Sequence, residues 1–93
     1  MRIKVVCQDK NEAVKLASMI FIKDGMETFI HSVVNVYGNE IVISLKDKSV
    51  HSIVLKDTKQ VEIFTDFIQS VVEKENHITD TKAVNDTVEI TKG

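Results

Sequence analysis

The chain holds one cysteine, three glycines, no proline and no tryptophan. A single cysteine excludes a disulfide within the chain and a metal site built from cysteine alone. Gly25, Gly38 and Gly93 are too scattered to form a phosphate-binding loop. The absence of proline and tryptophan, together with abundant lysine, isoleucine and valine, suggests an AT-rich bacterial or phage genome.

Long apolar runs are also missing. No segment approaches the roughly 20 apolar residues of a membrane span. The first residues do not contain the apolar core of about 7–15 residues that a secretory signal requires. We therefore expect a cytoplasmic protein that does not bind membranes. Cys7 lies among valines, which favours a buried and unreactive thiol.

Charge is balanced overall but unevenly distributed. The 93 residues carry a formal net charge of −2, and 43% of them are hydrophobic, as in an ordinary globular domain. Residues 1–60 contain nine basic and seven acidic residues, whereas residues 61–93 contain three basic and seven acidic ones. No overall basic field is present to attract nucleic acid. We expect a single α+β domain over residues 1–76, followed by a polar segment over residues 77–93.

The first half of the chain predicts a strand, a helix and a meander. Apolar alternation predicts a strand over residues 2–7, and Asp9 with Glu12 fits a capping box at the start of a helix that ends near Gly25. Residues 28–56 read as three antiparallel strands. Gly38 and Asn39 favour the first turn, and residues 47–49 the second.

A second helix is predicted to begin at Asp57 or Thr58 and to end near Asn76. Its apolar stripe consists of Val61, Phe64, Ile68, Val71 and Val72. Residues 77–93 are rich in threonine, aspartate and asparagine, which favours a flexible tail. The alternative is a last edge strand, because residues 87–91 alternate apolar with polar side chains.

The predicted order is β-α-β-β-β-α with an optional final strand. Such an order favours a two-layer α+β sandwich in which both helices cover one face of a sheet. The first strand, joined through a helix, is expected to lie parallel to a strand of the meander.

The predicted meander is apolar on both faces, and this is the main functional lead. By strict alternation, one face of this sheet is the face that the helices cover, and it consists of Ile30, Val34, Val36, Ile41, Ile43, Leu45, Ile53 and Leu55. The opposite face then shows Phe29, Val33, Tyr37, Val42, Val50 and Val54. Since a solvated face should be polar, this face predicts an interaction site. We take its contact residues to be Phe29, Val33, Tyr37, Val42 and Val54, facing a protein partner or a second copy in a homodimer.

Two alternatives remain for that face. In the first, single-stranded nucleic acid stacks on Phe29 and Tyr37 while Arg2, Lys4 and Lys56 neutralise phosphates. The acidic composition argues against it. In the second, residues 77–93 fold across the face and cover it with Val84, Val88 and Ile90.

No pattern in the chain is typical of catalysis. His31 and His51 fall on opposite faces by alternation and His77 follows the second helix, so the three should not converge on one metal. No serine lies in a strained turn beside a base and an acid. We expect a non-catalytic protein with no cofactor and no small-molecule substrate.

Overall fold

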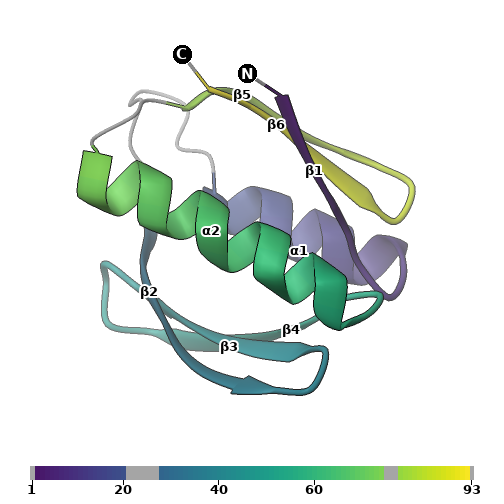
Figure 1. Cartoon of the computed structure of the whole chain (residues 1–93), viewed down its shortest axis with the longest axis horizontal. Helices are drawn as coiled ribbons and strands as arrows, with labels where there is room; N and C mark the ends of the chain where they lie inside the picture. The colour runs from purple at the N-terminus through teal and green to yellow at the C-terminus, as the bar shows by residue number, and fades with distance from the viewer. Residues whose placement is uncertain (1, 21–27, 75–77, 93) are drawn as a thin grey trace.

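The computed structural model describes residues 2–20, 28–74 and 78–92. This part of the chain forms two helices and six strands (Figure 1). Their order is β1 (Arg2–Val6), α1 (Lys10–Ile20), β2 (Ile30–Tyr37), β3 (Glu40–Leu45), β4 (Val50–Val54), α2 (Thr58–Lys74), β5 (Ile78–Val84) and β6 (Thr87–Lys92). The α+β class is confirmed. The helix ends predicted at Gly25 and Asn76, and the candidate His77, lie outside the described residues.

The strands form two separate antiparallel sheets rather than the single sheet predicted. One sheet has the order β1-β6-β5 and the other has the order β2-β3-β4. The prediction that β1 lies parallel to a meander strand is wrong, because β1 pairs antiparallel with β6. Ile3 and Val5 lie opposite Ile90 and Val88, so this pairing gives β1 an apolar neighbour for each inward side chain.

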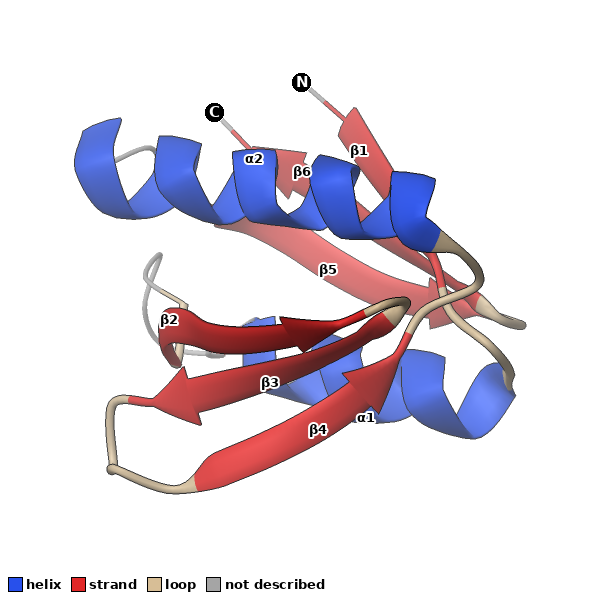
Figure 2. Cartoon of the chain, turned by 60° about the horizontal axis from the view of Figure 1, so that its bottom comes forward, coloured by secondary structure: helices blue, strands red, loops and turns tan. Residues whose placement is uncertain are grey.

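Both helices lie between the sheets and close the sides of one shared core. α1 contacts β4, β5 and β6, whereas α2 contacts β1 and β2. Figure 1 shows the two sheets on opposite sides of the molecule, and Figure 2 shows α2 and α1 on the other two sides. Every element therefore has one face on the core and one face outward.

The core is built from aliphatic residues and two phenylalanines. The fully or nearly fully buried side chains include Leu16, Ile20, Ile30, Ile41, Ile43, Ile53, Leu55, Phe64, Phe67, Val88 and Ile90. The rings of Phe64 and Phe67 lie 6.2 Å apart between centroids. Within the described residues, no helix is long and apolar enough to cross a membrane.

Aspartate side chains cap the N-termini of both helices, as the sequence indicates. The Glu12 backbone N–H donates to Asp9 Oδ1 at 2.9 Å, and the Gln60 N–H donates to Asp57 Oδ1 at 3.1 Å. Asp57 rather than Thr58 is therefore the second cap. Each bond satisfies one of the N–H groups that a helix leaves unpaired at its first turn.

The prediction of a flexible C-terminal tail is wrong. β5 and β6 form a hairpin whose turn holds Asn85 at a left-handed φ of 55°, and β6 is the central strand of its sheet. The alternation over residues 87–91 did indicate this strand, but not its central place. β5 escaped prediction because its inward residues Thr81 and Ala83 are polar or small, and because its register shifts after Ile78.

The two sheets meet at one corner. Cys7 and Leu55 form an isolated antiparallel bridge there. The Gln8 N–H donates to the Val54 carbonyl, and the Lys56 N–H to the Val6 carbonyl, each at 3.0 Å. These bonds join the end of β1 to the end of β4. The two sheets are therefore held together at this corner and separate from each other away from it.

We predict that Ile90→Ala destabilises the protein by about 2–5 kcal/mol, because it leaves a cavity at a fully buried site in the central strand. Urea unfolding followed by circular dichroism measures this. Lys82→Ala, on the neighbouring strand and exposed, is the control and should change stability by less than about 0.5 kcal/mol. Equal stability of the two variants would contradict a central β6.

Candidate functional site

Two irregularities in β2 change which residues share a face. The register with β3 shifts between Ile30 and Ser32 and again between Val33 and Asn35, so β2 is two residues longer than the stretch it pairs with. Each extra residue reverses the alternation. The predicted grouping of Phe29, Val33 and Tyr37 on one face is therefore wrong.

Val33 belongs to the inner side of the sheet. It lies opposite Ile43, which is fully buried, and packs against the core. Tyr37 lies opposite Glu40 on the outer side. Phe29 precedes β2, is 41% exposed, and lines a surface hollow of about 310 Å³ with Met19, Leu45 and other residues. Val33 lines a second hollow of about 350 Å³ between β2 and α2.

The outer side of β2-β3-β4 forms one continuous surface, which we call the outer face. Cross-strand pairing arranges it in three rows, which are Tyr37–Glu40–Val54, Asn35–Val42–Ser52 and Ser32–Ser44–Val50. Tyr37 and Val50 are the most exposed of its apolar residues, at 60% and 59%. Three of the five predicted contact residues, Tyr37, Val42 and Val54, lie together here.

The outer face has almost no charge. In a chain of which 28% is Asp, Glu, Lys or Arg, β2, β3 and β4 contain one such residue, Glu40. The two histidines of these strands, His31 and His51, are not part of the three rows of the outer face. The outward side of β1-β6-β5 provides the comparison. Its rows are Arg2–Thr91–Asp80, Lys4–Glu89–Lys82 and Val6–Thr87–Val84. The same architectural position is thus charged on one sheet and neutral on the other.

Asn35 holds the aromatic ring of the outer face in place. Its Nδ2 donates to Tyr37 Oη at 2.7 Å, and its Oδ1 accepts the Val36 backbone N–H at 2.9 Å. One side chain thus satisfies a backbone group of β2 and fixes the hydroxyl of Tyr37. A side chain that is already ordered loses less conformational entropy when a partner binds.

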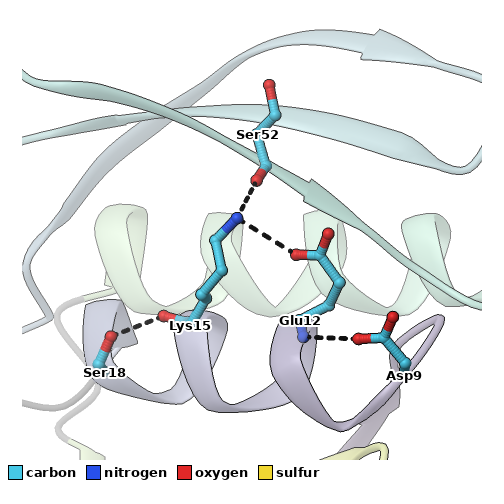
Figure 3. Close-up of polar contacts among 5 residues, drawn as sticks. All are labelled: Asp9, Glu12, Lys15, Ser18 and Ser52. Atoms are coloured by element: carbon cyan, nitrogen blue, oxygen red, sulfur yellow. Dashed lines mark hydrogen bonds and ion pairs between the residues drawn. The ribbon is translucent and has the colours of Figure 1, made fainter.

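The edge of β4 is covered by α1. Lys15 Nζ donates to the Ser52 carbonyl at 3.4 Å and lies 3.5 Å from Glu12 Oε2 (Figure 3). Glu12 in turn bonds to the cap residue Asp9, and Ser18 Oγ donates to the Lys15 carbonyl at 2.7 Å. This chain of contacts, together with the Gln8 bond to Val54, occupies carbonyls along β4 that would otherwise accept a further strand.

The basic residues considered for nucleic acid lie away from the outer face. Arg2 and Lys4 point outward from β1, in the other sheet. Lys56 follows β4 at the corner, where its N–H bonds to Val6. The structure does not bring Arg2 and Lys4 to the surface that holds Tyr37.

The histidines of the described residues form local contacts. His51 Nε2 lies 2.9 Å from Ser49 Oγ, and Ser49 Oγ donates to Asp47 Oδ1 at 2.5 Å. Hydrogen bonds from Ser49 lower the pKa of Asp47 below its ordinary value. His31 lies 3.3 Å from Ser32 Oγ. Over residues 2–20, 28–74 and 78–92, no three His, Cys, Asp or Glu side chains gather as metal ligands.

Cys7 is 1% exposed, as predicted. Burial, with smaller contributions from Glu12, Asp86 and Asp9, raises the pKa of its thiol from 9.0 to about 12. The thiol is therefore protonated at neutral pH, and the thiolate is the reactive form.

Comparison with protein-family models, with curated proteins and with solved structures finds no match.

We predict that Cys7 resists thiol reagents in the folded protein. At pH 8 its thiolate fraction should be about a thousandfold below that of an ordinary thiol, because of the raised pKa. The rate at which Cys7 reacts with Ellman's reagent measures this. It is compared between the folded protein and the protein unfolded in about 8 M urea. Rapid reaction of the folded protein would contradict a buried, protonated thiol.

Proposed function

We propose that this chain is a small non-catalytic interaction module. It binds a protein partner, or a second copy of itself, through the outer face of β2-β3-β4. The observation that carries the proposal is the difference between the two sheets. Both have an outward side that the core does not need, yet only the outer face lacks charge apart from Glu40.

The chemistry of the outer face suits a protein surface. Protein interfaces are depleted of charged residues at their centre and enriched in tyrosine. Tyr37 provides a large exposed ring, Val50 an exposed aliphatic group, and the serines and Asn35 provide hydrogen-bonding groups between them. Such a mixture of apolar and neutral polar groups favours a partner that binds reversibly.

The absence of catalysis is part of the same proposal. The Cys7 thiol is buried and protonated, so it is a poor nucleophile. His51, Ser49 and Asp47 bond to one another within an exposed turn, with Ser49 rather than the histidine in the middle. Ser49 donates a hydrogen bond to the Asp47 carboxylate rather than to the histidine, so the histidine is not placed as the general base that would activate the hydroxyl. The proposal also includes a cytoplasmic location and a bacterial or phage origin, on composition.

Nucleic acid is the less favoured partner. Binding to a single strand needs aromatic rings beside basic side chains. Tyr37 instead lies next to Glu40 on the outer face, and none of the nine residues in its three rows is lysine or arginine.

We predict that Tyr37→Asp and Val50→Lys each weaken protein binding by about tenfold or more, because each places a charge inside a neutral contact. The tagged chain is immobilised and offered both untagged chain and an extract of the source cells, and bound protein is quantified by mass spectrometry. Both residues are more than half exposed, so folding should persist.

Val84→Lys is the matched control. It makes the same substitution at an exposed valine on the outward side of the other sheet. The proposal requires that it leave binding unchanged. Equal effects of Val84→Lys and Val50→Lys, or no specific binding by the unaltered chain, would overturn the proposal.

A further inference from the structure

We infer that the occupant of the outer face is a second copy of this chain, packed face to face with its strands reversed. This inference rests on the proposed function and names the partner. In the arrangement, Glu40 of each copy lies beside the turn that carries Lys48 of the other.

Charge is the first argument for a second copy. Burying a charge without a partner is costly, so the surface that covers a neutral face must itself be neutral where it makes contact. The outer face meets this requirement, with Glu40 as its single charge. The outward side of β1-β6-β5 does not, because it carries Arg2, Lys4, Asp80, Lys82 and Glu89. A symmetric dimer uses the same patch twice, and of the two outward sheet sides the outer face is the one that can be used so.

The position of Glu40 selects the arrangement. If a two-fold axis runs along the strands, β3 of each copy points the same way and the two Glu40 side chains meet, which is unfavourable. If the axis runs across the strands, β3 of one copy is reversed over β3 of the other. Glu40 then faces Ser44 of the second copy, whose pairing places it at the other end of β3.

The reversed arrangement also places Glu40 next to an opposite charge. The turn after Ser44 and Leu45 holds Lys46, Asp47 and Lys48, which gives it a net charge of +1. Asp47 accepts hydrogen bonds from Ser49, whereas Lys48 is exposed and has a left-handed φ of 74°. The turn is fixed by the Lys48 N–H bond to the Leu45 carbonyl and the Leu45 N–H bond to the Ser49 carbonyl, at 3.0 and 2.9 Å. In the reversed packing, Glu40 of each copy thus lies beside the turn that carries Lys48 of the other, so two symmetric Glu40–Lys48 pairs are expected at the ends of the contact.

The sizes of the facing side chains agree with this arrangement. Reversing the strands places the row of Tyr37 and Val54 over the row of Ser32 and Val50. The ring of Tyr37 then lies over the small Ser32, and Val54 lies over Val50. Large side chains thus face small ones along β2, and aliphatic side chains face each other along β4, as sheet packing requires.

The size of the face sets the strength of the dimer. Three strands about 4.8 Å apart, with about six residues of about 3.4 Å each, span roughly 14 by 20 Å. Two such faces bury less than the roughly 1,200–2,000 Å² of stable protein complexes. A contact of this size is weak and transient, so the dimer should dissociate at micromolar to millimolar concentrations.

Sedimentation velocity from about 1 µM to about 1 mM tests the inference, because a weak dimer should shift toward monomer within that range. Glu40→Lys and Lys48→Glu should each weaken the dimer by about threefold to tenfold, and the double variant should recover most of the loss. Val50→Lys should weaken dimerisation by about tenfold or more, whereas Val84→Lys should leave it unchanged.

Three results would overturn the inference. A monomer at every concentration excludes a second copy as the partner. The proposed function would still stand if the immobilised chain bound another protein in a manner that Val50→Lys abolishes. A dimer unaffected by Val50→Lys forms through another surface and contradicts both proposals. A dimer that both charge reversals weaken without rescue by the double variant contradicts the reversed packing.

Discussion

The backbone bridge between Cys7 and Leu55 is the contact on which the rest of the fold depends. It joins β1 to β4 with only a few hydrogen bonds, so the two sheets meet at a corner instead of merging into one. Each three-stranded sheet has a single apolar side and too little area to be stable alone in a chain of 93 residues. The corner brings both apolar sides to α1 and α2, and one shared core results.

A shared core leaves both sheets with an outward side, and comparing these two sides separates folding from function. On β1-β6-β5, Lys4 and Lys82 lie on either side of Glu89, which is a solvated and mutually compensating arrangement. The outer face has no such pairs, although its strands also form antiparallel ladders. The outward sides of the two sheets are both turned away from the core. Folding therefore does not explain why only the outer face is nearly free of charge.

The sequence predicted what depends on local patterns. The α+β class, the meander and the caps at Asp9 and Asp57 follow from alternation and helix-start signals. The faces of β2 could not be predicted, because Val33 and Val34 are adjacent and either can point inward with the same local preference. The register of pairing with Ile41 and Ile43 on the next strand decides between them, and local preference does not set that register. The place of β6 depends on β1 in the same way, across nearly the whole chain.

The irregularities of β2 also change the kind of interface that the chain offers. Strict alternation would have put Phe29 and Val33 beside Tyr37 and made a broad apolar surface, typical of a permanent dimer. Instead Val33 packs against the core and Phe29 lies over a separate hollow, so the outer face keeps Tyr37 and valines among serines and Asn35. A face of this size and polarity is compatible with water when empty. The proposed contact is therefore one that forms and dissociates, which suits an interaction module whose occupancy follows concentration.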